Sequence, residues 1–319
     1  MVTGAAGFIG WKTSHSLAEK GFDVVGVDNM NDYYDVRLKQ HRLGDLKRHE
    51  NFSFHLLDIE NLEAIHDLFG SRRFDAVIHL AARAGVHASM DNPHIYMSTN
   101  VLGTLNLLEG MRRRQVRKMV LASTSSLYAG QPMPFREDSP VNAPISPYAA
   151  SKKASEIIAY TYHHHFDMDI IILRYFTVYG PAGRPDMSIF RFMKWIDEEK
   201  PVTLFGDGTQ GRDFTYIDDI AAGTVKALDA RGYDIINLGG GKKPVTMRDV
   251  IKIMEAGLGK KAAIEQVPAR KEDIKDTWAC IEKAGRVLDW RPETDLEDGL
   301  HETIRWYAMN RNWIKNIQM

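Results

Sequence analysis

A tyrosine and a lysine four positions apart, Tyr148 and Lys152, are the side chains of this sequence best suited to acid–base chemistry. On a helix, positions i and i+4 lie on the same face, so the ammonium group is expected beside the phenol. A phenol titrates near about 10, which makes it a poor base at neutral pH, and a neighbouring cation lowers its pKa. The pair therefore predicts a proton acceptor for a hydroxyl group.

A cluster of hydroxyl side chains, Thr124, Ser125 and Ser126, precedes this pair and follows an apolar run that is expected to be a strand. A hydroxyl at the end of that strand can hold the reacting oxygen while Tyr148 takes its proton. We therefore predict Thr124, Tyr148 and Lys152 as the catalytic residues of a hydride transfer at a secondary alcohol.

Glycines with a phosphate-binding spacing stand near the start, in Gly4-Ala-Ala-Gly7-Phe8-Ile9-Gly10. They permit a tight turn and let backbone N–H groups approach a diphosphate at the N-terminus of a helix. The spacing is G-x-x-G-x-x-G, which differs from the commoner G-x-G-x-x-G. On its own this motif is weak, and the acid that follows it strengthens the prediction of a dinucleotide site.

That acid is Asp28, which stands 18 residues after Gly10 at the end of an apolar run. A carboxylate there can accept hydrogen bonds from the ribose diol of an adenosine, and it repels a 2′-phosphate. We therefore predict NAD rather than NADP as the cofactor. Asp58 follows the next apolar run, and it fits an adenine contact and a strand-end cap equally well.

These residues lie at the ends of short apolar runs that alternate with helical patterns. The expected strands are 24–27, 52–56, 76–80, 119–123 and 170–173, and the expected helices are 11–19, 61–69, 95–113, 147–165, 247–258 and 296–310. Such strands predict an α/β fold with a doubly wound, parallel Rossmann-type sheet covered on both faces. Only two residues precede Thr3, so we expect an unusually short first strand or a chain that begins late.

Glycine and proline become more frequent after residue 173, for example in Gly180-Pro181, Gly206 and Gly208. We predict an NAD-binding Rossmann-type domain over residues 1–173, with a return segment near 213–240. Residues 174–319 are expected to form mainly a smaller α/β domain for the substrate, which lies over the ends of the sheet strands.

The composition narrows the class of protein. The 319 residues are 44% hydrophobic and carry a net charge of −1, which provides no general attraction for nucleic acid or an anionic membrane. There is no apolar run of about 18 residues and no signal-peptide pattern, so we expect no membrane span and a cytoplasmic protein. The single cysteine, Cys280, excludes an internal disulfide and fits a reducing compartment.

Three local features have simpler explanations than function. Arg112-Arg113-Arg114 follows a helical pattern and is interpreted as a solvated helix end. Consecutive residues point around a helix, so His163-His164-His165 is not expected to bind a metal, and we predict no metal site. Cys280 is interpreted as a small apolar side chain rather than a nucleophile.

Over essentially its full length the sequence resembles the extended short-chain dehydrogenase/reductases, which include sugar-nucleotide epimerases, dehydratases and decarboxylases. The motifs that carry the resemblance are Thr3–Gly10 with its glycines, His79-Leu80-Ala81-Ala82, Asn100-Val-Leu-Gly103, Pro147-Tyr148-Ala-Ala-Ser-Lys152, Arg174-Tyr175-Phe176 and Arg212-Asp213-Phe214. The resemblance implies tightly retained NAD, a nucleotide-sugar substrate and a homodimer formed through the helices that begin near Ile95 and Pro147. The cofactor-binding residues that we predict are Gly4, Gly7, Phe8, Ile9, Gly10, Asp28, Asn29, Asp58, Ile59, Leu80, Ala81, Ala82, Asn100, Tyr148, Lys152 and Tyr175.

Two segments resemble the UDP-glucuronate 4-epimerase branch of this family, Asp28-Asn-Met-Asn-Asp-Tyr-Tyr-Asp35 and Thr177-Val-Tyr-Gly-Pro-Ala-Gly-Arg184-Pro-Asp-Met187. The resemblance implies epimerisation of a UDP-sugar, UDP-glucuronate to UDP-galacturonate, through a transient 4-keto sugar. An acidic sugar needs donors around its carboxylate, and hydroxyls together with one arginine provide them. Two arginines also suit a diphosphate. The predicted substrate-binding residues are Ser125, Ser126, Thr177, Arg184, Met187, Arg212, Arg270 and Asp273.

Several positions depart from the family pattern. Arg83 and His87 stand where the family usually has glutamine and arginine, Trp11-Lys12 replaces a small and polar pair, and Arg270 begins a segment that more often is Pro-Gly-Asp. Ser125 follows Thr124 directly, without the Asp-Glu pair of the dehydratases. The alternatives left open are a 4-epimerase of UDP-glucose or UDP-N-acetylglucosamine, a UDP-glucuronate decarboxylase, and a non-catalytic NAD-binding regulator. Arg184 also fits a surface-loop arginine.

Overall fold

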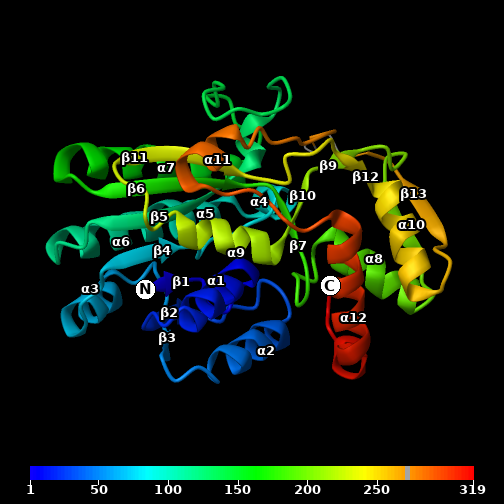
Figure 1. The fold of residues 1–319 in the computed structure, drawn as a ribbon, viewed down its shortest axis with the longest axis horizontal. Helices are drawn as coiled ribbons and strands as arrows, with labels where there is room; N and C mark the ends of the chain where they lie inside the picture. The colour runs from blue at the N-terminus through cyan, green and yellow to red at the C-terminus, as the bar shows by residue number, and fades with distance from the viewer. Residues whose placement is uncertain (270–273) are drawn as a thin grey trace.

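A computed structural model describes residues 1–269 and 274–319, and its centre is a seven-stranded sheet (Figure 1). Neighbouring strands in this sheet pair in parallel, in the order β11-β6-β5-β4-β1-β2-β3. The strands are β1 (Val2–Thr3), β2 (Val24–Asp28), β3 (Phe52–Leu56), β4 (Ala76–His79), β5 (Lys118–Thr124), β6 (Asp169–Tyr175) and β11 (Tyr233–Leu238). The predicted doubly wound α/β fold is confirmed.

The first strand is as short as expected. β1 contains two residues, yet it lies between β2 and β4 in the sheet, with Val2 opposite Gly26 and Ile78. The amino group of Met1 extends the pairing, because it donates a hydrogen bond of 2.9 Å to the carbonyl of Ala76. The strand ends at Thr3, and from there the chain enters the glycine loop at the carboxyl edge of the sheet.

Helices cover both faces of the sheet. On one face, α1 (Phe8–Glu19) packs against α9 (Ile217–Lys226), and α2 (Val36–Leu46) packs beside α1. On the other face lie α3 (Leu62–Ser71), α6 (Gly103–Arg113) and α7 (Pro147–Phe166). The apolar residues of α1 and α9 meet one side of the strands in one core, and those of α3, α6 and α7 meet the other side in a second core, as the near-continuous apolar strands predicted.

The helix predicted over residues 95–113 is interrupted. The structure has α5 (Pro93–Tyr96), a π-helical turn (Met97–Leu102) and then α6. Asn92 caps this segment, and the buried Asn100 lies within the wide turn. π-turns are often found at functional sites, because they move one side chain out of the regular helical register.

The remaining elements lie mainly at the carboxyl edge of the sheet. They are α4 (Val86–Asp91), a 3-10 turn (Ser125–Tyr128), β7 (Thr177–Tyr179), α8 (Ser188–Asp197), β8 (Val202–Phe205), β9 (Gly211–Arg212), β10 (Phe214–Tyr216), β12 (Val245–Thr246), α10 (Met247–Leu258), β13 (Ile264–Val267), α11 (Glu282–Leu288) and α12 (Leu296–Ile314). α8, α10 and α12 enclose a core of their own. β11 returns to the large sheet beside β6, and the division into domains at residue 173 stays a prediction.

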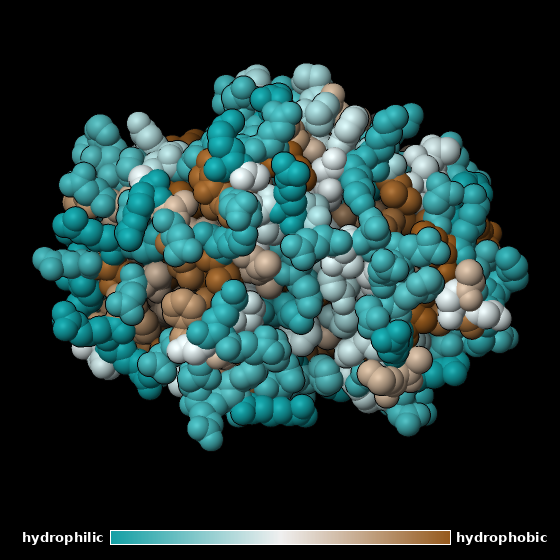
Figure 2. Space-filling model, in the orientation of Figure 1, coloured by the Kyte–Doolittle hydropathy of each residue, from teal (hydrophilic) through white to brown (hydrophobic). Residues whose placement is uncertain are grey.

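The visible face of the molecule is mostly hydrophilic, and its hydrophobic residues are scattered in separate patches (Figure 2). Within the described ranges 1–269 and 274–319, no helix combines the length and the apolar character that crossing a membrane requires.

Candidate active site

A cavity of about 650 Å³ lies at the carboxyl edge of the sheet, between the sheet and the segments that follow β6. It collects most of the residues predicted from the sequence. Those that line it are Gly4, Gly7, Phe8, Ile9, Gly10, Leu80, Ala81, Ala82, Thr124, Ser125, Ser126, Tyr148, Lys152, Tyr175, Thr177, Arg184, Met187 and Arg212.

The three predicted catalytic residues line this cavity together. Thr124 is the last residue of β5, and its hydroxyl accepts a hydrogen bond from the backbone N–H of Ser126 at 3.1 Å. Tyr148 and Lys152 lie in the first turns of α7, as their spacing predicted. This helix begins where it does because Ser146 caps the N–H of Ala149, and Pro147 occupies the first helical position.

Burial shifts the pKa values of Tyr148 and Lys152 in opposite directions. It raises the pKa of the Tyr148 phenol, whereas the Thr124 hydroxyl and the charge of Arg184 act in the opposite direction. Burial also lowers the pKa of Lys152 to about 8, against the opposing effect of Glu156. The sequence predicted that the neighbouring lysine lowers the pKa of the phenol. The protein groups alone instead raise the pKa of Tyr148, because desolvation of the phenolate outweighs the nearby donors.

The glycine loop has the tight geometry that the motif predicted. Gly4 has a positive φ of +69°, and a Cβ atom at Gly10 would lie 2.0 Å from the carbonyl oxygen of Gly4. A Cβ at Gly7 would meet the same oxygen at 2.9 Å. Gly7 caps α1 without a side chain, so the first N–H groups of this helix face the cavity edge without a side-chain cap. Such a helix end suits a diphosphate.

Asp28 lies at the end of β2 and is largely buried. Its carboxylate accepts hydrogen bonds from the backbone N–H groups of Ala6 at 3.1 Å and Met30 at 2.8 Å. Lys39, which the sequence interpretation missed, lies 3.5 Å from the same carboxylate and lines the cavity. Lys39 lies on helix α2. The buried residues Leu38, Leu43 and Leu46 are the sequence signal from which this helix, and with it Lys39, could have been predicted.

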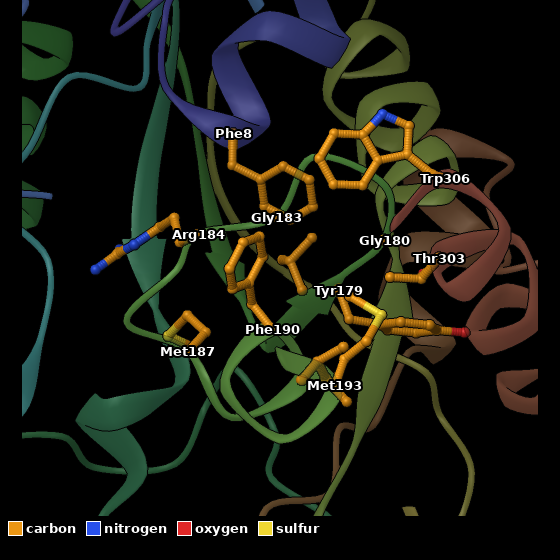
Figure 3. Close-up of a pocket in the computed structure, with 12 residues that line it drawn as sticks. Phe8, Tyr179, Gly180, Gly183, Arg184, Met187, Phe190, Met193, Thr303 and Trp306 are labelled. Atoms are coloured by element: carbon orange, nitrogen blue, oxygen red, sulfur yellow. The ribbon is translucent and has the colours of Figure 1, made fainter. Parts of the chain in front are cut away.

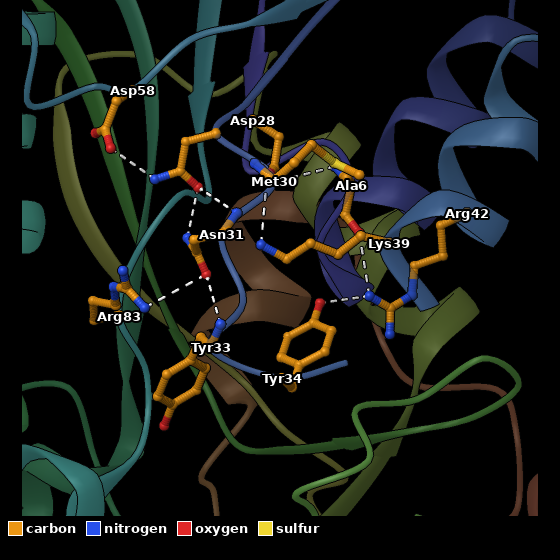
Figure 4. A network of polar contacts seen from close by, with 11 residues as sticks. Ala6, Asp28, Met30, Asn31, Tyr33, Tyr34, Lys39, Arg42, Asp58 and Arg83 are labelled. Atoms are coloured by element: carbon orange, nitrogen blue, oxygen red, sulfur yellow. Dashed lines mark hydrogen bonds and ion pairs between the residues drawn. The ribbon is translucent and has the colours of Figure 1, made fainter. Parts of the chain in front are cut away.

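A chain of amide contacts leads from Asp58 toward the cavity (Figure 4). Asn29 donates to Asp58 at 2.8 Å and accepts a hydrogen bond from Asn31 at 2.6 Å, and Arg83 lies 3.5 Å from Asn31. Asp58 also accepts from the N–H of Glu60, as a strand-end cap does. Among the predicted cofactor residues, Asp28, Asn29, Asp58, Ile59 and Asn100 are not part of the cavity wall, and their contact with a cofactor stays a prediction.

Asn100 supports that wall from behind. Its side chain exchanges hydrogen bonds with the backbone of Arg83, and it donates to the Ser151 hydroxyl on α7 at 2.8 Å. Ile59 is buried against Gly103. Asn100 therefore fixes the loop after β4 against the helix that carries Tyr148 and Lys152.

Arg184 is not an isolated cation. Its Nε and Nη2 atoms lie 3.0 and 2.6 Å from the two carboxylate oxygens of Asp186. Its guanidinium stands over the rings of Tyr33 and Tyr34, at 5.6 and 5.9 Å from their centroids. Figure 3 shows that the guanidinium points away from a small apolar cavity behind it, between Phe8 and Phe190. Asp186, Tyr33 and Tyr34 are also lining residues that the sequence interpretation missed.

Two of the described positions that depart from the family pattern lie at the site. Arg83 and His87 line the cavity, and the Arg83 guanidinium stands 5.7 Å from the Tyr33 ring. Trp11 donates to Asp45, and Lys12 pairs with Asp218, so both residues have structural partners. The predicted residues Arg270 and Asp273 lie outside the described residues.

The features given simpler explanations lie away from the cavity. His163 bonds the carbonyl of Met168 through Nδ1, and Arg112 pairs with Glu109 at the end of α6. Cys280 is buried. Among residues 1–269 and 274–319, no three His, Cys, Asp or Glu side chains are grouped so as to hold a metal ion.

Comparison with known proteins identifies the class. A model of the NAD dependent epimerase/dehydratase family matches residues 1–239. The chain is 57% identical over 319 residues to a UDP-glucuronate 4-epimerase of Thermodesulfobacterium geofontis, and the match covers 100% of this chain and 99% of that protein.

Two solved structures agree with the sequence match. The UDP-glucuronic acid 4-epimerase of Bacillus cereus, in complex with UDP-glucuronic acid and NAD, has a TM-score of 0.91 and 38% identity, over 97% of this chain and 98% of that one. The UDP-glucose 4-epimerase of Thermotoga maritima with UDP-glucose has a TM-score of 0.88 and 30% identity, over 97% and 98%. The resemblance drawn from the motifs is thereby confirmed, and the chain belongs to the NAD dependent epimerase/dehydratase family.

Proposed function

We propose that this protein is an NAD-dependent 4-epimerase that interconverts UDP-glucuronate and UDP-galacturonate. The observation that carries the proposal is the convergence of two sets of side chains on one cavity. Thr124, Tyr148 and Lys152 provide the means to oxidise a secondary alcohol, and Thr177 and Arg184 line the same cavity with donors for a carboxylate. The 57% identity to a protein described as a UDP-glucuronate 4-epimerase supports the choice of sugar.

The residues at the glycine loop fit NAD. The uncapped N-terminus of α1 suits the diphosphate, and Asp28 at the end of β2 suits the ribose diol. When bound, NAD supplies the reversible uptake of a hydride from C4 of the sugar. Leu80, Ala81 and Ala82 would also line its site, and Tyr148 and Lys152 would stand at its reacting end.

Proton transfer is the role of the Tyr148 phenolate. It accepts the O4 proton as the alcohol becomes a ketone, and it returns that proton to O4 when C4 regains its hydride on the other face. Lys152 favours the phenolate by its charge, and Thr124 holds O4 by its hydroxyl. The protein therefore needs no external oxidant, because the electrons removed from C4 return to C4 in the same cycle.

The sugar carboxylate must be held while C4 is a ketone. A 4-keto uronate is a β-keto acid, which loses CO₂ when the bond to the carboxylate aligns with the carbonyl π system. Hydroxyls of Ser125, Ser126 and Thr177 can hold the carboxylate away from that alignment, because small displacements change reaction rates strongly. Arg184 shares its donors with Asp186, so it contributes fewer N–H groups than a free arginine would.

A comparison of substrates tests the proposal. The protein is incubated separately with UDP-glucuronate, UDP-glucose and UDP-N-acetylglucosamine, and the products are resolved by NMR over time. We expect UDP-galacturonate from UDP-glucuronate, with little UDP-pentose and slow or absent conversion of the neutral sugars. Thr177→Ala should raise the share of UDP-pentose, because one hydroxyl that holds the carboxylate is removed.

The other outcomes have definite meanings. If the native protein forms mostly UDP-pentose, it is a decarboxylase. That result would refute the proposed role of the groups that donate hydrogen bonds to the sugar carboxylate. Preferred conversion of UDP-glucose would mean that Arg184 serves a neutral sugar and that Arg83 and His87 were better guides to specificity.

We also propose that the protein forms a homodimer. Large apolar side chains on the π-turn and α6 segment and on α7 are more than two fifths exposed, namely Met97, Leu102, Ile157, Tyr160 and Phe166. Pairing with a second copy would remove this surface from water. Light scattering after gel filtration should give twice the 36.2 kDa chain mass, and Ile157→Glu should shift the protein toward the monomer.

A further inference from the structure

Arg42 on α2 is an arginine that is fully buried, with an exposed fraction of 0%. Among the described residues it forms no ion pair with a carboxylate. Instead its guanidinium donates to oxygen atoms of the backbone and of one phenol. Because a buried charge is costly unless its hydrogen-bonding groups are satisfied, this arrangement indicates a specific use of the guanidinium.

The acceptors of Arg42 come from three separate segments. Nε and Nη2 donate to the carbonyl of Ala182 at 3.0 and 2.7 Å, and Nη2 reaches the carbonyl of Gly183 at 3.3 Å. Nη1 donates to the carbonyl of Ala6 at 3.1 Å and to the Tyr34 hydroxyl at 2.6 Å (Figure 4). From its place on α2, Arg42 therefore joins the segment of Ala6 to the segment of Ala182, although the two are more than 170 residues apart in the sequence.

Both joined segments belong to the site. Ala6 lies inside the glycine loop, between Gly4 and Gly7. Ala182 and Gly183 lead directly into Arg184, and Tyr34 lies under the Arg184 guanidinium. A displacement of either segment would therefore move the groups expected at the cofactor diphosphate or at the sugar.

The segment before Arg184 needs such support. Ala182 has a φ of +55°, in the left-handed region that L-residues seldom adopt, and Gly180 has a φ of +148°. A left-handed conformation at a residue other than glycine, such as Ala182, persists only where the surroundings over-determine it. Two adjacent carbonyls held by one planar guanidinium provide that restraint, since the fork of donors fixes direction as well as distance.

Packing alone does not account for these contacts. The Arg42 guanidinium also stands 5.7 Å from the Phe8 ring and 5.5 Å from the Tyr34 ring. A long apolar side chain such as methionine would fill that space, but it would leave the carbonyls of Ala6, Ala182 and Gly183 without these donors. The two roles therefore predict different results for substitution.

We infer that Arg42 is a positioning residue that holds the Arg184 segment against the glycine loop and thereby sets the preference for an acidic sugar. The inference rests on the proposed function of Arg184. Arg42 contacts neither the sugar nor the cofactor in this account. It acts by keeping Arg184 where the carboxylate arrives.

Binding measurements test the inference independently of turnover. In a Tyr148→Phe background, which slows the reaction by orders of magnitude, calorimetry gives the affinities for UDP-glucuronate and UDP-glucose in the presence of saturating NAD. Arg42→Met should lower the affinity for UDP-glucuronate at least about fivefold more than that for UDP-glucose, the lower end of typical coupling between sites. Arg42→Lys should cause a relative loss of affinity between those of the native residue and Arg42→Met, because a lysine keeps the charge but not the forked set of donors.

The matched control is Arg48→Met, which removes an exposed arginine just after the same helix and should leave both affinities unchanged. Equal losses for both sugar nucleotides in the Arg42 variants, or no loss, would overturn the inference. If Arg42→Met fails to fold, the Arg42→Lys ratio decides alone. Failure of the proposed function is distinguishable, because then the native protein itself would not convert UDP-glucuronate.

Discussion

At the scale of single residues, Tyr148 is the side chain on which the proposed reaction depends most. Tyr148→Phe removes the proton acceptor but keeps the ring, which packs edge-on against Tyr96 at 6.1 Å. We expect kcat to fall by about 10²–10⁴-fold, the usual contribution of general acid–base catalysis, while UDP-sugar affinity stays near the native value. Steady-state kinetics and calorimetry on the same preparation check this. Thr124→Val should also slow the reaction, though less, and a near-native kcat in Tyr148→Phe would remove Tyr148 from its role.

Asp28 is the residue on which the choice of cofactor depends. Asp28→Asn keeps an acceptor oxygen for only one of the N–H groups of Ala6 and Met30, which bond different carboxylate oxygens, and it leaves the buried ammonium of Lys39 without its carboxylate. Binding of NADP relative to NAD should therefore rise by roughly tenfold, the scale of one charge-assisted hydrogen bond.

Fluorescence titration of cofactor-free protein with NAD and with NADP measures this preference. Asp32→Asn, an exposed residue of the same loop, is the control and should keep the native preference. Recovery of mainly NADP from the denatured native protein would contradict the assignment.

Much of the candidate site was predictable at this scale because its residues sit in compact motifs. Tyr148 and Lys152 are one helical turn apart, and Gly4, Gly7 and Gly10 follow one another at intervals of three residues, so local spacing already implies their geometry. Asp186 was not recognised as the partner of Arg184, because two residues of separation in a loop do not determine whether side chains meet. Lys39 was missed because its helix was missed.

At the scale of elements, the turn between β1 and α1 permits a sharp test. Gly10→Ala would place a Cβ 2.0 Å from the carbonyl oxygen of Gly4, which is backbone and cannot move aside cheaply. We expect destabilisation at or beyond the roughly 1–3 kcal/mol of overpacking, together with loss of bound cofactor.

Gly44→Ala on α2 is the matched control, because a Cβ there meets nothing within 4 Å. This change should stabilise the protein by about 0.5–1 kcal/mol, since alanine is the better helix former. Urea unfolding of both variants measures the difference. A stable Gly10→Ala protein that retains cofactor would show that the loop is not as tight as described.

The bounds of elements with a regular local pattern of apolar residues were predicted closely. The bounds of elements shaped by contacts with distant parts of the chain were not. β3 (Phe52–Leu56) and α10 (Met247–Leu258) have the predicted bounds. The helix expected over 95–113 contains a π-turn, whose buried Asn100 bonds Arg83 and Ser151 from other parts of the chain. Helix α2 carries many polar residues, and its buried Lys39 and Arg42 hide the apolar stripe that would have revealed it.

At the scale of the whole molecule, Asp213 links stability to pH. Burial raises the pKa of its carboxyl to about 7, against the opposing hydrogen bonds from the N–H groups of Ala279, Gly241 and Gly240. In the unfolded chain the same group titrates near 3.8. Between these values only the folded protein holds the proton, so unfolding releases it and the free energy of unfolding falls as pH rises from about 4 to about 7.

The fall attributable to Asp213 is on the order of 4 kcal/mol at most, from about 1.4 kcal/mol per pKa unit. Asp213→Asn should remove this part of the slope, because an amide does not titrate. Urea unfolding at several pH values between 5 and 8 measures it, with the exposed Asp229→Asn as the control. A native slope in Asp213→Asn would mean that other groups cause the pH dependence.

Contacts between distant parts of the chain are what the sequence alone could not predict. β11 joins the large sheet beside β6, with Ile235 opposite Ile172, and the sequence supported only a return segment near 213–240. The contact of Arg42 with Ala182 joins residues 140 positions apart. Neither the pairing of β11 with β6 nor the contact of Arg42 with Ala182 can be predicted from a local sequence pattern, because each depends on how the surrounding helices pack.

The central claim is that the same hydride leaves C4 and returns to it inside one cavity. The most direct measurement uses UDP-glucuronate labelled with deuterium at C4, incubated with the native protein in ordinary water and followed by NMR. We predict UDP-galacturonate that keeps the deuterium at C4, since neither the hydride nor the ketone leaves the site. Loss of the label to water, with UDP-galacturonate still formed, would contradict internal hydride transfer at C4.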